Sequence, residues 1–229
     1  VVELEKQNQE LDAFAHMVAH DLKNPLNNIM GFSELLQRRA QMDEKTIDNI
    51  TRWIYEGGFK MNDIIDSLLL LSGVRRSEVK LAPLAMEKLL EAALRRLRFE
   101  VELSQAQISQ PEGLPAALGY APWVEQVWSN YLSNAIKYGG QPPRLELGAF
   151  PAEDGKMVRF QVADNGPGLT SEQIAQLFKP FARLHRERAS GHGLGLTIVE
   201  RIVTRLGGSV GVESTPGAGS TFYFTLQAA

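Results

Sequence analysis

The sequence predicts two domains, an all-α helical hairpin followed by an α+β sandwich of one mixed sheet with helices on one face. Two observations indicate this division. Up to residue 71, apolar residues recur at helical steps of three, four or seven, as on helices that pack lengthwise. Further along, helical patterns mix with alternating, strand-like ones, which is typical of α+β domains. The polar stretch from Arg75 to Glu78 separates the patterns, so we expect domains at residues 1–74 and 75–229.

The hairpin is predicted from two long amphipathic helices. The first begins near Val2, and Pro25 should kink it because proline lacks a backbone donor. The second begins at Asp43, a suitable N-cap, and only Gly57 interrupts its apolar seam before Leu71. Two helices alone cannot bury both apolar stripes. We therefore expect the hairpin to form a homodimer, as a four-helix bundle.

The elements of the second domain follow from periodicity and turn residues. Helices are expected from Met86 to about Leu97, from Pro122 to Tyr138, from Ser171 for a short stretch, and through Leu206. Strands are expected near Ile108 and Leu118 and over residues 144–150, 157–163, 209–213 and 220–226.

Composition excludes several classes of protein. A net charge of -3 and a pI near 5.9 leave no basic footprint for nucleic acid. The absence of cysteine excludes disulfides and thiolate metal sites and fits a reducing compartment. No apolar run approaches the roughly 20 residues of a membrane span, so we expect a soluble, cytoplasmic fragment. The chain begins at Val1 in helix-prone sequence, as an excised piece of a longer protein would.

One face of the first helix carries groups suited to phosphate chemistry. His20 lies beside the apolar stripe and should face water, Asn24 shares its face one turn on, and Asp21 projects about 100° round the helix. An ordinary solvated histidine is an equally good interpretation of this helix alone. His16 and His20 also have a metal-ligand spacing, but the glutamate of a zinc protease is missing between them.

Three further clusters could bind a flat ligand and phosphates. Asp164 to Gly168 follows a strand, where glycines let backbone approach a ligand and the carboxylate can accept from an amine, although the same residues also make a good turn. Gly191 to Leu196 opens a helix whose free amides can meet phosphates, although such a loop is more often only flexible. Asn130, Asn134 and Lys137 share a helical face where carboxamide oxygens can ligate Mg²⁺ and the lysine can meet phosphate; capping or solvation is the alternative.

Taken together, these stretches resemble the cytoplasmic core of a two-component sensor histidine kinase over nearly the whole chain. The run from His20 to Leu26, preceded by Phe14, is similar to that family's phosphoacceptor box. In the second domain, the family's asparagine box resembles residues 130–138, its first glycine box residues 164–168 and its phenylalanine box residues 178–181. Its second glycine box resembles residues 191–196, and its last glycine turn resembles residues 217–221. Five or six motifs in the right order are a specific signal. The resemblance implies a Bergerat-type ATP-binding domain after a dimerisation and histidine phosphotransfer hairpin.

The resemblance also implies roles for the clustered residues. Asp164 would recognise the amino group of adenine in ATP. Asn134 would hold Mg²⁺ against the triphosphate, and Asn130 and Lys137 would help to bind the phosphates. The loop from Lys179 to His192 would be a mobile lid. The residues implied at the nucleotide are, in all, Asn130, Asn134, Lys137, Tyr138, Asp164, Gly166, Gly168, Phe178, Arg183, Gly191, Gly193, Leu194, Gly195, Leu196 and Thr221.

In the hairpin, the same resemblance implies that His20 takes the γ-phosphoryl group on one ring nitrogen, while Asp21 accepts a hydrogen bond from the other ring nitrogen. The group would pass to an aspartate of a response regulator receiver domain, and Asn24 would position a water for dephosphorylating that partner. The N-terminal sensor domain would be absent from this chain. Phe181 to His185 resembles kinases coupled to PAS- or phytochrome-like sensors.

Two alternatives stay open. The first is an ATPase of the same nucleotide-binding fold that modifies no histidine, against which the His20-Asp21 pair on a helical hairpin argues. The second is a degenerate kinase serving only as a dimeric scaffold or receiver-binding module. The residues that argue against it are Asn134, Asp164, Gly193 and Gly195. One departure from the family concerns Gly119 to Trp123, which lacks the acidic residue that many relatives have before the asparagine-bearing helix.

Overall fold

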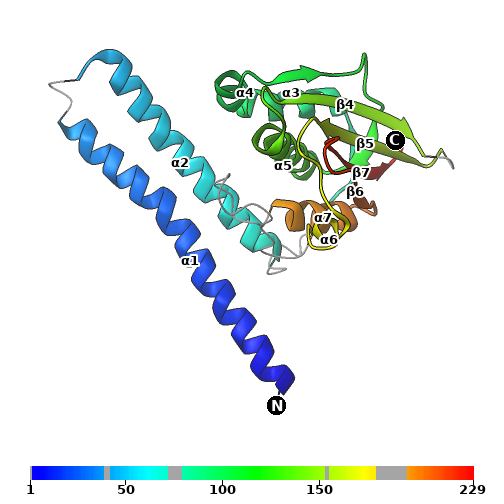
Figure 1. Cartoon of the computed structure of the whole chain (residues 1–229), viewed down its shortest axis with the longest axis horizontal. Helices are drawn as coiled ribbons and strands as arrows, with labels where there is room; N and C mark the ends of the chain where they lie inside the picture. Colours follow the sequence, from blue (N-terminus) through cyan, green and yellow to red (C-terminus); the bar gives the residue numbers. More distant parts are fainter. Residues whose placement is uncertain (1, 39–41, 72–78, 153–154, 179–194) are drawn as a thin grey trace. The chain divides into compact units, whose positions relative to one another are not determined.

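The computed structural model describes residues 2–38, 42–71, 79–152, 155–178 and 195–229 (Figure 1). They belong to two compact units, residues 1–75 and 76–229. No helix of these described residues is long and apolar enough to cross a membrane.

The first unit is the expected hairpin. Helices α1 (Val2–Gln37) and α2 (Glu44–Leu71) run side by side in opposite directions (Figure 1). Asp43 is the N-cap of α2, because its Oδ1 accepts the Thr46 backbone amide at 2.6 Å. Pro25 lies inside α1, which continues through it as one helix.

Gly57 fills a structural role in the seam that it interrupts in the sequence. The residue is buried, and a Cβ placed on it would lie 2.7 Å from Cγ1 of Ile29 and 3.5 Å from the carbonyl oxygen of Pro25. The two helices therefore approach closely at this point, between Ile50 and Ile64, which are both buried. The absent side chain is what permits the contact.

Two glycines of the hairpin should respond oppositely to alanine. At Gly31, which is exposed and has nothing within 4 Å of an added Cβ, alanine should raise the free energy of unfolding by up to about 1 kcal/mol through helix propensity. At Gly57 the same gain is opposed by the clash with Ile29, so Gly57→Ala should be neutral or destabilising. Thermal unfolding followed by circular dichroism, at one protein concentration, would measure the difference. Equal stabilisation by both substitutions would contradict the close helix contact.

The second unit is built on a five-stranded mixed sheet in the order β2-β4-β5-β7-β6. Only β2 and β4 pair in parallel, and the other neighbours are antiparallel. The strands are β2 (Gln107–Ser109), β4 (Arg144–Pro151), β5 (Met157–Asp164), β6 (Val210–Ser214) and β7 (Ser220–Gln227). The mixed sheet confirms the predicted α+β class.

Helices cover one face of this sheet. Helix α5 (Ala121–Tyr138) packs on β4 and β5, and α7 (Gly195–Arg205) packs on β6 and β7. Helix α3 (Met86–Arg96) packs against α5. The short α6 (Ser171–Ile174) follows β5 and begins with a capping box formed by Thr170 and Gln173.

An aromatic cluster fixes α5 on the sheet. Trp128 and Tyr131 of α5 are fully buried. The ring of Trp128 lies 6.1 Å from that of Phe160 on β5 and 5.2 Å from that of Phe224 on β7, both edge to face. The Tyr131 hydroxyl donates to the backbone carbonyl of Tyr223 at 3.0 Å. Because these contacts hold α5 by its apolar side, its polar side is presented in a defined orientation.

Some elements do not appear in the sequence prediction. The predicted strand near Leu118, β3 (Ala117–Gly119), pairs with an unpredicted strand, β1 (Ala82–Leu84), in a second sheet, and an unpredicted helix, α4 (Arg98–Ser104), follows α3. The residues of β1, Ala82, Pro83 and Leu84, show no apolar-polar alternation, so β1 has no local signal. Helix α4 has no buried residue, so it lacks the apolar face that predicts a helix.

Candidate functional site

Asp164 is the last residue of β5. One of its carboxylate oxygens accepts the Gly166 backbone amide at 2.8 Å. Partial burial raises the pKa of this carboxyl above its usual range, while hydrogen bonds from the backbone amides of Gly166 and Ser220 act in the opposite direction. A half-buried acceptor of this kind makes a strong hydrogen bond to an amine, because water competes poorly for it.

The loop after β5 is attached on both sides. On one side, a Cβ on Gly166 would lie 2.5 Å from the carbonyl oxygen of Tyr138, so the loop touches the end of α5. On the other side, Gly217 donates its amide to the Pro167 carbonyl at 2.6 Å. Gly168 has a positive φ of +68°, which favours glycine, at a point where its backbone meets that of Thr215. The structure thus brings two glycine-containing segments and the end of α5 together around Asp164.

The polar side of α5 carries the asparagines of the predicted site. The Asn130 amide donates to the Gln126 carbonyl at 2.9 Å, and its Oδ1 lies 2.5 Å from where a Cβ of Gly195 would be. Gly195 is the first residue of α7, so the structure brings these two motifs into contact. Asn134 is half-buried, and within the described part of the chain its side chain has no hydrogen-bond partner. Lys137 is exposed in the last turn of the helix.

The strand register separates the predicted site residue Thr221 from Asp164. Asp164 pairs with Ser220 on β7, whereas Thr221 pairs with Ala163. Because side chains alternate along a strand, Ser220 shares the face of Asp164, and Thr221 lies on the opposite face of the sheet. Ser220 is 7% exposed, and its hydroxyl lies 2.9 Å from that of Ser214. The alternation of buried residues beyond it, at 222, 224 and 226, is the signal in the sequence that places Ser220 on the buried face of β7.

Other predicted site residues are placed only in part. Phe178 is half-buried, and its carbonyl accepts the Thr197 hydroxyl of α7 at 3.3 Å. Leu196 is half-buried in the first turn of α7, and Tyr138 is exposed at the end of α5. The predictions for Arg183, Gly191, Gly193 and Leu194 lie outside the described residues.

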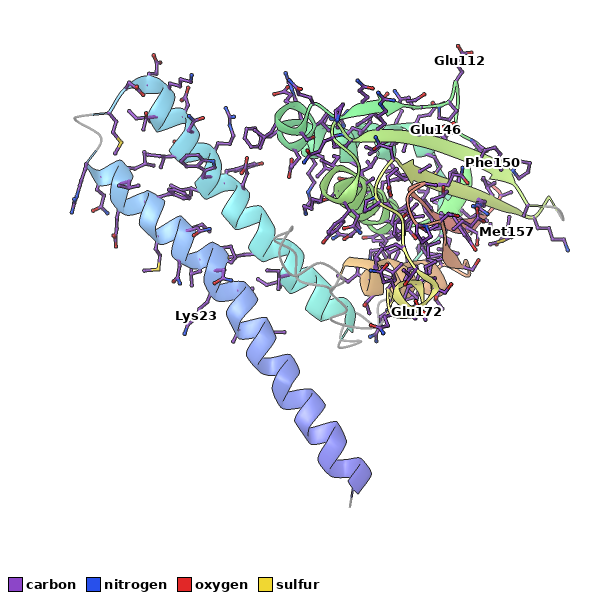
Figure 2. All side chains as sticks on the ribbon, in the orientation of Figure 1. Lys23, Glu112, Glu146, Phe150, Met157 and Glu172 are labelled. Atoms are coloured by element: carbon purple, nitrogen blue, oxygen red, sulfur yellow. The ribbon has the colours of Figure 1, made fainter. Side chains whose placement is uncertain are left out.

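The predicted phosphoacceptor lies in the other unit. His20 and Asp21 belong to α1, and their side chains lie outside the described part of the structure. Asn24, one turn further on, is exposed. Its neighbour Lys23 projects from α1 on the side away from α2 (Figure 2). Asn24 and Lys23 thus present polar groups to solvent beside the buried Pro25.

A carboxylate-rich metal site is absent from the described residues, where no three histidine, aspartate or glutamate side chains are grouped to hold an ion. The carboxamide of Asn134 instead offers one neutral oxygen. Such a donor fits Mg²⁺, which prefers oxygen and keeps several of its ligands as water or substrate phosphate oxygens.

The sandwich, with its glycine loops gathered beside an asparagine-bearing helix, defines an ATPase-like nucleotide-binding domain that follows a helical hairpin. Residues 119–229 match the family described as histidine kinase-, DNA gyrase B- and HSP90-like ATPase. Residues 10–75 match the His Kinase A (phospho-acceptor) domain. The chain therefore belongs to the two-component sensor histidine kinases, of which it contains the core. The phosphoacceptor domain disfavours an ATPase without histidine chemistry.

Relatives of known name agree with this assignment. The chain is 36% identical to cyanobacterial phytochrome B of Nostoc sp. (strain PCC 7120), over 99% of this chain and 30% of that protein. It is 31% identical to the adaptive-response sensory kinase SasA of Thermosynechococcus vestitus, over 97% of this chain and 61% of that protein. The chain thus spans less than a third of the phytochrome's length.

Solved structures show the same arrangement of elements. Full-length ShkA in complex with AMPPNP superimposes with a TM-score of 0.67 at 28% identity, over 95% of this chain and 46% of that one. Histidine kinase ThkA in complex with the response regulator protein TrrA gives a TM-score of 0.62 at 17% identity, over 98% of this chain and 64% of that one. The second likeness concerns the fold alone.

Proposed function

We propose that this chain uses ATP to phosphorylate itself on His20 and passes the phosphoryl group to an aspartate of a response regulator. The observation that carries the proposal is the presence, in one chain, of a phosphoacceptor hairpin and an ATPase-like domain in which Asp164, Asn130 and Gly195 occupy contacting loops and helices. In this proposal, residues 1–74 are the dimerisation and phosphotransfer domain and residues 75–229 the catalytic one.

The nucleotide would be held by groups of different chemistry. The Asp164 carboxylate can accept a hydrogen bond from the exocyclic amine of adenine. It is partly desolvated, and one of its oxygens already accepts the Gly166 amide. Asn134, half-buried and with no hydrogen-bond partner in the described part of the chain, is the residue that we assign to Mg²⁺, which when bound neutralises charge on the triphosphate. Lys137 adds a positive charge at the same end of α5.

Phosphoryl transfer joins a ring nitrogen of His20 to the γ-phosphorus, and the bond from that phosphorus to the bridging oxygen breaks, so that ADP leaves with the electron pair. Asp21 is next to His20 in sequence and would accept from the other ring nitrogen, which stabilises the developing cation. Asn24, exposed one turn on, would position a water when the chain dephosphorylates its regulator.

The surface of the hairpin supports dimerisation. Leu26, Met30 and Ile65 are 41%, 55% and 42% exposed in the single chain. Large apolar side chains at helical spacing on a hairpin are normally covered by another helix pair. A second copy of the hairpin is the partner that we propose for this surface, and the regulator is the partner for transfer, as in the ThkA complex with TrrA.

The test is to incubate the chain with γ-labelled ATP and Mg²⁺. We expect label on the protein that is labile to acid and stable to base, because the phosphoryl group is bound to nitrogen. The label should be absent in His20→Ala, which removes the nucleophile, and absent when Mg²⁺ is chelated, which leaves the charge of the triphosphate unneutralised. His16→Ala, one turn earlier on the same helix, is the matched control and should keep the label. Hydrolysis of ATP without labelled protein would indicate an ATPase, and neither activity would indicate a scaffold.

A further inference from the structure

The side chain of Asn165 ties the loop that follows α5 to the turn that follows β5. Its Oδ1 accepts two backbone amides, from Gly140 at 2.9 Å and from Arg144 at 2.8 Å. Its Nδ2 donates to the Pro142 carbonyl at 3.2 Å. One carboxamide thus satisfies three backbone groups of the loop over residues 139–144.

The two segments also meet backbone to backbone. A Cβ on Gly140 would lie 2.7 Å from Nδ2 and 2.8 Å from the carbonyl oxygen of Asn165, and a Cβ on Gly166 would lie 2.5 Å from the carbonyl oxygen of Tyr138. Gly139 donates its amide to Ala135 at 2.9 Å and so continues directly from the last turn of α5. With no side chain between the segments, a shift of one backbone displaces the other.

This contact joins the two halves of the nucleotide site. Asp164, the residue assigned to the adenine amine, is adjacent to Asn165 in the chain. Asn134 and Lys137, assigned to the phosphate end, lie in the last two turns of α5, just before the loop that Asn165 holds. One ligand can use both ends with full effect only when their separation matches its own length.

We propose that Asn165 is a positioning residue, which sets the separation between the Asp164 carboxylate and the phosphate-facing end of α5 without touching the nucleotide itself. The proposal rests on the proposed function, because it assigns both ends to one ATP molecule. It predicts that loss of the Asn165 carboxamide weakens the binding of ligands that contact both ends of the site and leaves the binding of ligands that contact only one end nearly unchanged.

Two ligands separate these effects. In Asn165→Ala, the Kd for Mg²⁺-ATP should rise about tenfold or more, whereas the Kd for adenosine, which lacks phosphates, should change less than about threefold. Asn165→Asp keeps an oxygen that accepts both amides but replaces the donor to the Pro142 carbonyl with an acceptor, so its ATP Kd should lie between those of Asn165→Ala and the wild type. Glu146→Ala, an exposed position on β4 labelled in Figure 2, is the matched surface control and should change neither.

Calorimetric titration of the whole chain with ATP, and titration with adenosine followed by nuclear magnetic resonance, would give these constants at a temperature well below the melting point of each variant. If Asn165→Ala does not fold, Asn165→Ser replaces it and should show the same split. Equal weakening of ATP and adenosine, or no weakening of either, would overturn the positioning role. If the wild type binds neither ligand and takes no label on His20, the proposed function itself fails.

Discussion

Asp164→Asn is expected to weaken ATP binding about 100-fold or more and to abolish labelling of the chain at micromolar ATP. The substituted amide can turn only one oxygen toward a donor, and the Gly166 amide already occupies the oxygen on that side. The amine of adenine would then face an N–H group in a partly desolvated site, where an unpaired donor is costly. Titration with ATP would measure the loss, with Glu146→Gln on the exposed side of β4 as a control for removal of one negative charge.

The same substitution should not destabilise the fold at neutral pH. Burial raises the folded pKa of the Asp164 carboxyl above its ordinary value of 3.8, so the contribution of this group to stability is present below that value and is lost as pH rises through the folded pKa. The asparagine has no charged form, and the free energy of unfolding of Asp164→Asn relative to wild type should therefore increase from about pH 4 to pH 7. Urea unfolding at a series of pH values would test this. A variant that loses stability and binding together would show that Asp164 serves the fold and not the ligand.

Gly219→Ala is expected to lower the free energy of unfolding of the catalytic unit by at least about 3 kcal/mol and to abolish ATP binding. Gly219 has a φ of +89°, and a Cβ there would overlap the backbone carbonyl oxygen of Asp164. A left-handed backbone costs an alanine about 1–2 kcal/mol. The overlap adds to this cost because a backbone carbonyl, unlike the end of a side chain, has no other rotamer. The shift would also displace the carboxylate of Asp164 from its position.

Gly217 provides the matched control in the same turn. Its φ is +84°, but an added Cβ would have nothing within 4 Å. Gly217→Ala should therefore lower the free energy of unfolding only by the cost of a left-handed backbone at alanine, about 1–2 kcal/mol, and should leave ATP binding intact. Urea unfolding and ATP titration of both variants would give the comparison. Similar losses in the two would refute the close approach of the turn to Asp164.

Long elements could be predicted from the sequence because their pattern repeats. The hairpin seam up to Leu71 and the alternation in β4, β5 and β7 extend over enough residues to reveal helix or strand by themselves. The three-residue strands β2 and β3 were expected near Ile108 and Leu118, whereas β1 was not, because it arises from pairing with the distant β3 and shows no pattern of its own. A recognisable apolar pattern within the element thus decided which elements were predictable.

The chemistry of the site was determined by the sequence itself, because a carboxylate, two carboxamides and glycine-rich loops in a particular order carry the same functional groups in any arrangement. Which of them meet was decided only by the tertiary structure. Which of Ser220 and Thr221 shares the face of Asp164 depends on the register of β7 with β5. The fit of Gly57 depends on Ile29 of the other helix, and the hydrogen bonds of Asn165 depend on residues that lie 21 to 25 positions earlier in the chain. Contacts of this kind join residues far apart in the chain, and their geometry exists only once the whole sheet and its helices have packed.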